Sequence, residues 1–251
     1  MFLQSVLLLA GAWMCQGQTP SAATASADDV AQMQKQLSVQ ERRLKDWPAL
    51  NRYRPDNAKV QPPAEGEDRV VFMGDSITDG WGKRYGKFFP GKTYLNRGIG
   101  GQTTPQMLLR FRNDVLAHEP KVVVILAGTN DIAGNTGPAT LEDIEGNLAT
   151  MSELAKLHGI KVVLSSVMPI CDYIRVQSDR RPMDKIQALN VWIKDYAAKN
   201  GHVYLDYYTP MLDDKGNFKQ ELTYDGLHPN DAGYELMGPM AQKAIDKALG
   251  H

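Results

Sequence analysis

The pattern of apolar and polar positions divides most of the chain into strands and helices that alternate. Five apolar runs have the length of strands and are rich in β-branched residues. These runs lie at residues 69–73, 93–95, 121–127, 161–167 and 202–206. Segments with apolar residues at helical spacing lie between and after them. The predicted helices lie near residues 104–117, 140–158, 183–200 and 231–249.

Apolar strands separated by helices are typical of a parallel sheet that is covered on both faces. We therefore expect an α/β fold with three layers, doubly wound and flavodoxin-like, with five parallel strands in the order 2-1-3-4-5. Ligand sites in such sheets lie at the carboxyl ends of the strands. The residues just after each strand are therefore the first candidates for function.

The amino-terminal segment has a different composition. The first 27 residues contain no charged side chain, and their most apolar run extends from Phe2 to Cys15. This run is too short to span a bilayer and has the length of a signal-peptide core. We expect a signal peptide over residues 1–27, cleaved near residue 17 or 27. The protein would then be exported, to the periplasm or the medium, without stable membrane insertion. Two alternatives stay open, a lipoprotein signal with Cys15 lipidated and a buried helix.

Residues 28–67 are expected to form a helix and a linker. Val30, Met33, Leu37 and Leu44 recur at helical spacing in a polar segment that ends near Lys45. Pro55, Pro62 and Pro63 then predict an extended connection to the core. Residues 68–251 would form the main domain.

Composition excludes several classes of protein. The chain has 251 residues, with 28 Lys plus Arg against 29 Asp plus Glu, so it has no basic surplus for binding nucleic acid. Its 43% apolar and 23% charged residues are ordinary for a globular protein. The two cysteines, Cys15 and Cys171, are too few for a disulfide framework. We expect no bound metal.

Four polar clusters follow predicted strands and should meet at one edge of the sheet. They are residues 74–80, 96–103, 128–131 and 224–229. Together they bring a serine hydroxyl, several glycines, an amide and an Asp–His pair to one crevice.

This combination of groups suits acyl transfer. The Ser76 hydroxyl is a weak nucleophile until a base removes its proton, and His228 could be that base, since imidazole is a common general base in enzymes. Asp225, three residues before His228, can orient the imidazole and stabilise its charged form. Charge that develops on a carbonyl oxygen needs donors, which the backbone N–H groups of Ser76 and Gly101 and the Asn130 amide can supply.

The other histidines do not share this setting. His158 and His202 have structural positions near a helix end and at a strand start, His118 is expected at the surface, and His251 is the last residue. Each site signal alone also has an ordinary explanation, since a serine in a Gly-Asp-Ser turn commonly caps a helix. Their order along the chain favours the catalytic interpretation.

The chain resembles the GDSL-like, or SGNH, hydrolase superfamily from about residue 68 to 248. Gly74-Asp75-Ser76 matches the first block, although Ile77 stands where the family has leucine. Gly101, Asn130 and the Asp225–His228 pair match the later blocks. The run from Gly98 to Gly101, followed by Thr103 and Thr104, is most similar to platelet-activating-factor acetylhydrolase subunits and their bacterial relatives.

The resemblance implies a serine esterase that works through an acyl-enzyme and needs no cofactor. Ser76, Asp225 and His228 would be its catalytic residues, and Ser76, Gly101 and Asn130 would form its oxyanion hole. Members of the superfamily act on acetyl esters, lipid esters and acylated sugars, so the family leaves the substrate open.

The connection over residues 169–182 bears on the substrate. It is rich in charged and polar residues. The other connections between the site clusters are mostly short, and none is an apolar insertion that could cover a long acyl chain. We therefore expect short acyl groups on a saccharide or another polar alcohol. The alternative for this connection is a solvated loop with no contact to substrate. The alternatives for the protein are a lipolytic enzyme such as a lysophospholipase, and a non-catalytic carbohydrate or phosphate binder on the same scaffold.

Overall fold

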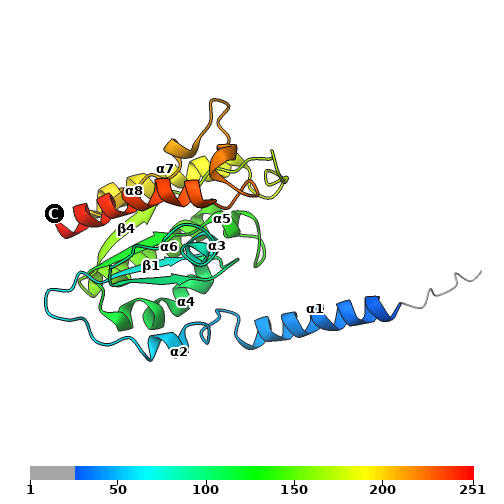
Figure 1. The fold of residues 1–251 in the computed structure, drawn as a ribbon, viewed down its shortest axis with the longest axis horizontal. Helices are drawn as coiled ribbons and strands as arrows, with labels where there is room; N and C mark the ends of the chain where they lie inside the picture. Colours follow the sequence, from blue (N-terminus) through cyan, green and yellow to red (C-terminus); the bar gives the residue numbers. More distant parts are fainter. Residues whose placement is uncertain (1–25) are drawn as a thin grey trace, which may run out of the picture. The chain divides into compact units, whose positions relative to one another are not determined.

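Five parallel strands form the sheet on which the main part of the chain is built (Figure 1). The computed structural model describes residues 26–251. The strands are β1 (Val70–Gly74), β2 (Tyr94–Gly98), β3 (Val122–Leu126), β4 (Lys161–Ser165) and β5 (Val203–Leu205). Their order is β2-β1-β3-β4-β5, and every pairing is parallel, so the predicted topology is confirmed.

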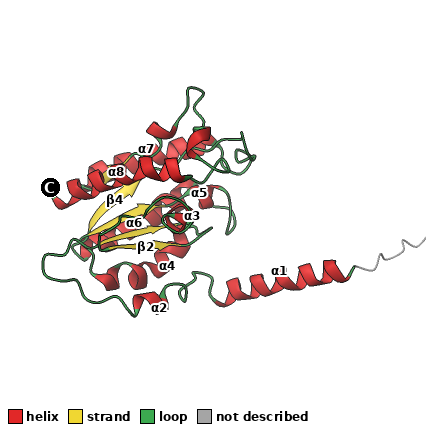
Figure 2. Ribbon diagram, viewed as in Figure 1, coloured by secondary structure: helices red, strands yellow, loops and turns green. Residues whose placement is uncertain are grey.

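Helices cover both faces of this sheet, and Figure 2 shows the strands between helices α4 and α8. The long helices of this part are α4 (Thr104–Asp114), α6 (Leu141–Leu157), α7 (Met183–Asn200) and α8 (Asp231–Leu249). Three short helices complete this part. Helix α2 (Arg54–Asn57) precedes β1, α3 (Ser76–Gly80) follows β1, and α5 (Thr129–Ile132) follows β3. Three 3₁₀ turns lie at Leu116–His118, Thr209–Met211 and Gln220–Leu222.

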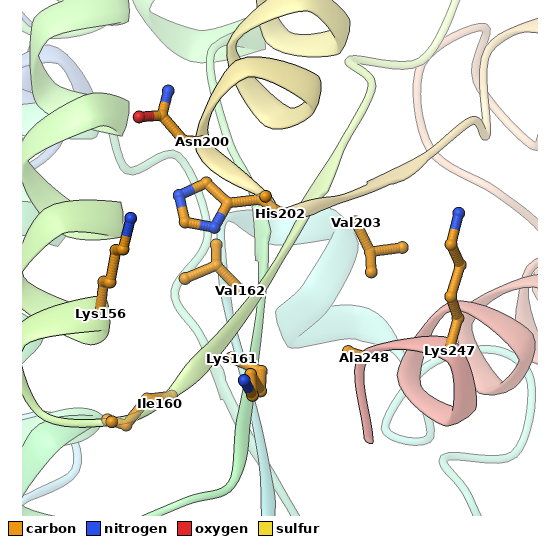
Figure 3. Close-up of a pocket in the computed structure, with 11 residues that line it drawn as sticks. Lys156, Ile160, Lys161, Val162, Asn200, His202, Val203, Lys247 and Ala248 are labelled. Carbon is orange, nitrogen blue, oxygen red and sulfur yellow. The ribbon is translucent and has the colours of Figure 1, made fainter. Parts of the chain in front are cut away.

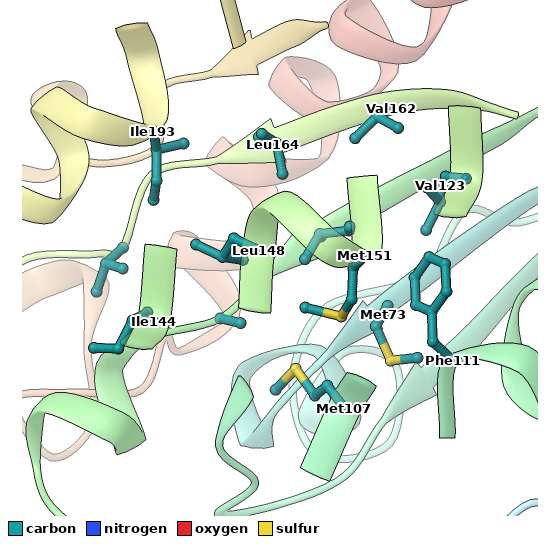
Figure 4. Packing of buried hydrophobic residues seen from close by; sticks show 14 of the residues in the cluster. Met73, Met107, Phe111, Val123, Ile144, Leu148, Met151, Val162, Leu164 and Ile193 are labelled. Carbon is teal, nitrogen blue, oxygen red and sulfur yellow. The ribbon is translucent and has the colours of Figure 1, made fainter. Parts of the chain in front are cut away.

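The two faces of each strand enter different hydrophobic clusters because successive side chains point to opposite sides. On one side, Val71 and Met73 of β1 pack with residues of α4, α6 and α7 (Figure 4). On the other side, Val70 and Phe72 pack with residues of α3 and α8. Burial on both faces explains why these strands are apolar without alternation.

Helix α1 (Ala27–Lys45) precedes this part of the chain. The chain forms two compact units, and the boundary between them follows Arg42, inside this helix. Its apolar positions are exposed, from 44% at Val30 to 83% at Leu44. The expected signal peptide, its cleavage points and Cys15 lie outside the described residues. None of the helices in residues 26–251 contains an apolar stretch of the length that a membrane span requires.

Two expectations from the sequence are wrong. Pro55, expected in an extended linker, lies in the first turn of α2, where proline costs little because its missing N–H has no helical partner. His118, expected at the surface, is only 5% exposed, and its Nε2 lies 2.9 Å from Asn57 Oδ1. Burial and the nearby Arg97 charge lower its pKa to about 4.

We predict opposite stability effects for two Gly→Ala substitutions. A Cβ at Gly98 would lie 2.1 Å from the Asp79 nitrogen, so Gly98→Ala forces β2 and α3 apart and should cost about 1–3 kcal/mol. A Cβ at Gly146, inside α6, meets no atom within 4 Å, so Gly146→Ala should stabilise by about 0.5–1 kcal/mol. Urea unfolding of both variants checks this. Equal effects at the two positions would contradict it.

Candidate active site

Ser76 lies at the turn where β1 passes into α3. Asp75 caps that helix through a hydrogen bond from the Ile77 backbone N–H to its Oδ1 (2.9 Å). Gly74 makes the turn possible, because a Cβ there would lie 2.1 Å from Thr78 Oγ1. Ser76 therefore begins a helix at the carboxyl edge of the sheet with its side chain partly exposed.

The Ser76 hydroxyl, the His228 imidazole and the Asp225 carboxylate form a continuous chain of contacts. Ser76 Oγ lies 2.9 Å from His228 Nε2, and His228 Nδ1 lies 2.8 Å from Asp225 Oδ2. The second oxygen of Asp225 accepts the backbone N–H groups of Leu227 and His228. The arrangement connects a nucleophile, a base and the group that orients the base.

Asp225 is held in its ionised form. Burial on its own raises the pKa of this carboxyl, but hydrogen bonds from the side chain and backbone of His228 outweigh burial and lower the pKa to about 2. The carboxylate therefore remains charged over the whole range in which an imidazole titrates.

The turn that carries Asp225 and His228 is tied to the connection after β4. Gly226 has φ +88°, and a Cβ there would lie 2.2 Å from the Cys171 carbonyl oxygen. The Cys171 N–H donates to the Gly226 carbonyl (2.9 Å). Next to this turn, the Tyr224 ring stacks on the imidazole of His228 at 5.6 Å.

Asn130 lies at the start of α5 and is 3% exposed. Its Nδ2 donates to the carbonyl of Gln102 (3.1 Å) and to Asp75 Oδ2 (3.3 Å), which are neighbours of Gly101 and Ser76 in the chain. Among the described residues, Gly101 makes no hydrogen bond to the other predicted site residues. It reaches Asn130 through Asn135, whose Nδ2 donates to the Gly101 carbonyl (3.1 Å) and to Asn130 Oδ1 (2.9 Å).

Two cavities meet at Gly100 on this edge of the sheet, since this glycine lines both. The smaller one, about 320 Å³, contains Ser76 and His228 and is otherwise lined by polar, charged and aromatic residues. The larger one, about 540 Å³, lies beside Gly101, and its apolar side chains are Trp47, Ala49 and Ile99. Its lining includes Asp46, Gln102, Gln106, Asn135, Thr136 and Arg180.

Residues 72–236 match the model of the GDSL-like Lipase/Acylhydrolase family, and this segment includes Ser76, Asn130 and His228. The chain belongs to this family. It is therefore a carboxylic ester hydrolase, and the resemblance found in the sequence is confirmed.

Known members of the family are similar over most of the chain. The alpha1 subunit of platelet-activating factor acetylhydrolase IB from Pongo abelii is 31% identical over 183 residues, 70% of this chain and 74% of the subunit. The structure of a GDSL-like lipase from Bacteroides thetaiotaomicron is 43% identical with a TM-score of 0.74, covering 80% of this chain and 98% of the lipase.

Other relatives are matched over part of their length. An acetylxylan esterase of Xylanibacter ruminicola is 26% identical over 223 residues, 74% of this chain and 45% of the esterase. An uncharacterized lipoprotein of Bacillus subtilis is 35% identical over 124 residues, 43% of this chain and 51% of the lipoprotein. The chain thus spans about half the length of these two relatives.

A further cavity of about 430 Å³ lies between the last turns of α6, α7 and α8, at the amino ends of β4 and β5 (Figure 3). Lys156, Lys161, His202 and Lys247 line it. Basic residues at helix carboxyl termini interact favourably with the helix dipole, and none of the predicted site residues lines this cavity. In the described part of the chain, no group of three or more His, Cys, Asp or Glu side chains could hold a metal ion.

Several residues at the site were not singled out as functional by the sequence. Trp47 belongs to the segment before the main domain, and its carbonyl accepts a hydrogen bond from Gln106 Nε2 (2.6 Å). Asn135, Gln177 and Arg181 make hydrogen bonds to other residues of the site. Gln177 and Arg181 were expected only as part of a polar connection, but both are buried.

Two buried carboxyls flank the site, and burial raises the pKa of both. The pKa of Asp75 rises to about 6 although Ile77 donates to it. The pKa of Asp131 also rises to about 6, although its carboxyl accepts the N–H of Thr104 (2.9 Å) and the hydroxyl of the same residue (2.6 Å).

We predict that Asp131 makes the fold less stable as the pH rises from about 4 to 6. Its pKa is 3.8 when exposed and about 6 in the fold, so in this range the unfolded chain has lost a proton that the native state retains. Raising the pH then favours unfolding, by about 3 kcal/mol over the range. Asp131→Asn keeps an oxygen for Thr104 and removes the titration. Urea unfolding of both proteins at pH 4, 5, 6 and 7 checks this, and a constant difference between them would contradict it.

Proposed function

We propose that Ser76, His228 and Asp225 form the catalytic triad of an esterase that releases short acyl groups from polar alcohols, with acetylated saccharides as the preferred class. The observation that carries this proposal is the 2.9 Å contact between Ser76 Oγ and His228 Nε2, with Asp225 behind the imidazole. In this proposal the oxyanion hole consists of the N–H groups of Ser76 and Gly101 and the side-chain amide of Asn130.

The proposed reaction has two balanced steps. Ser76 Oγ attacks the carbonyl carbon as His228 Nε2 takes its proton, and the imidazolium then returns this proton to the alcohol oxygen as the ester bond breaks. Water repeats the attack on the acyl-enzyme, again losing a proton to His228, and the acid is released as Ser76 recovers its hydrogen. Asp225 stabilises the imidazolium in both steps.

This chemistry assigns the two cavities to the two parts of the substrate. The alcohol oxygen must face His228 to receive its proton, so the alcohol occupies the cavity that contains His228 and Tyr224. Lys83 and Arg84 also line that cavity, and they suit the hydroxyl groups of an alcohol better than hydrocarbon. The acyl group then points past Gly100 and Gly101 into the larger cavity.

The lining of the larger cavity supports a short acyl group. Each additional CH₂ favours binding by roughly 0.8 kcal/mol only where apolar surface receives it. Most side chains in this cavity are amides, hydroxyls or charged groups, so a long chain would gain less there than in an apolar pocket. Relatives described as an acetylhydrolase and an acetylxylan esterase also support an acetyl group.

The rival function is a non-catalytic binder of carbohydrate or phosphate. A phosphate site at the start of α3 would place the anion beside the carboxylate of Asp79, which lines the same cavity. A binder would also have no use for the contact between Asp225 and His228.

Replacing Ser76 by alanine should abolish esterase turnover, because the nucleophile is lost while the helix start remains. A fluorophosphonate probe should label the wild-type protein and leave Ser76→Ala unlabelled, as intact mass measures. Ser178→Ala is the control, because that hydroxyl bonds to Asp172 and not to the imidazole. Wild-type turnover in Ser76→Ala, or labelling at another residue, would remove Ser76 as nucleophile.

The kcat/KM for p-nitrophenyl esters should fall from the acetate or butyrate to the decanoate, since most side chains that line the larger cavity are polar or charged. Initial rates over the acyl series measure this, with acetate release from acetylated xylo-oligosaccharides as the second assay. If kcat/KM instead rises through ten carbons, or lysophospholipids are cleaved and acetylated sugars are not, the enzyme is lipolytic.

A further inference from the structure

Arg181 is a buried cation at the end of the connection after β4, directly before α7. Its side chain donates only to neutral acceptors: Nη1 to Gln177 Oε1 (3.1 Å), Nε to Thr129 Oγ1 (3.2 Å) and Nη2 to Asn130 Oδ1 (3.4 Å). The residue is 6% exposed. Two of these three hydrogen bonds, to Thr129 and Asn130, therefore direct the guanidinium toward α5.

The Arg181 charge has no paired counter-ion. Among the described residues, no carboxylate oxygen lies within 4 Å of its guanidinium, although Asp75 and Asp225 act on it over a longer distance. Burial lowers its pKa. A buried charge without a partner costs several kcal/mol, so stability alone does not explain this side chain.

The contact with Asn130 connects Arg181 to the reaction. Asn130 Oδ1 accepts from Arg181 and from Asn135, so the amide oxygen faces two donors. A flipped amide would turn its NH₂ group toward these donors, and the contacts therefore fix Nδ2 on the side of Asp75 and Gln102. A cation bound to the amide oxygen also polarises the amide and makes its N–H groups stronger donors.

We infer that Arg181 is a positioning residue for the oxyanion amide, holding and polarising Asn130 so that the Nδ2 hydrogen of the longer bond, to Asp75 (3.3 Å), can be donated to the developing negative charge instead. This inference rests on the proposed function. The negative charge that balances the guanidinium is the one that forms on the substrate oxygen during each step, in a site where low dielectric strengthens the interaction.

A second contact extends the role of Arg181 to the triad. Gln177, which accepts from Arg181, donates from Nε2 to the backbone carbonyl of Asp225 (3.2 Å). The pair thus bridges the turn that carries Asp225 and the helix that carries Asn130. The connection after β4 therefore acts on the site through buried hydrogen bonds.

The test is Arg181→Met, which keeps the side-chain length and removes the charge and the donors. For p-nitrophenyl acetate, kcat should fall about 10- to 100-fold with KM changed less than about threefold, because the lost interaction acts mainly in the transition state. The melting temperature should stay unchanged or rise, because the variant no longer buries an unpaired charge. Titration with the fluorophosphonate probe gives the concentration of reactive Ser76, so that kcat can be calculated per functional site.

Two further variants complete the experiment. Arg175→Met, in the same connection and exposed, should keep wild-type kcat. Arg181→Lys keeps the charge but cannot reach three acceptors with one ammonium group, so its kcat should lie between those of wild type and Arg181→Met. The kcat of Arg181→Lys also tests the inference if Arg181→Met does not fold.

The inference is overturned if kcat per titrated Ser76 stays within threefold of wild type in both Arg181 variants. It is equally overturned if only KM rises, which would indicate substrate binding, or if kcat and the melting temperature fall together, which would indicate a structural role. Failure of the proposed function looks different, because wild-type protein would then show no labelling of Ser76 at all.

Discussion

The contact between Ser76 and His228 joins positions 152 residues apart, and the geometry of the site depends on it. It requires that β1 end and α8 begin at the same edge of the sheet. The position where β1 ends is set by two glycines whose backbones pack closely against neighbouring atoms. Gly74 allows β1 to turn immediately into α3, and Gly98 allows β2 to lie against that same helix. A side chain at either glycine would move Ser76 away from the imidazole by displacing α3.

The position where α8 begins is set by hydrogen bonds around the turn of residues 223–228. The Thr223 hydroxyl donates to the His228 carbonyl (2.7 Å), and Asn230 caps α8 two residues later. Because a Cβ at position 226 would lie 2.2 Å from the Cys171 carbonyl oxygen, this turn also depends on the connection after β4. The imidazole is therefore positioned by three separate segments, which explains how a loop residue can hold a fixed distance to Ser76.

The sequence predicted the sheet well because its strands are buried on both faces and appear as unbroken apolar runs. It predicted the candidate site residues through their positions after strands, and it identified the family. It could not predict the roles of Gln177 and Arg181, because polar residues in a long connection look the same whether exposed or buried. His118 was misjudged for a related reason, since its burial depends on Asn57, more than sixty residues away. Trp47 likewise reaches the larger cavity only through tertiary contacts.

Three buried groups at the site share one physical property, because each is an ionisable side chain removed from water. Asp75 and Asp131 have raised pKa values because of burial, and Arg181 is buried without an ion pair. Each group costs stability, and all three lie at the edge of the sheet that holds Ser76. A core selected for stability alone would replace such groups with apolar side chains of similar volume. Their position at this edge is the pattern expected where a protein gives up stability to keep an electrostatic environment for reaction.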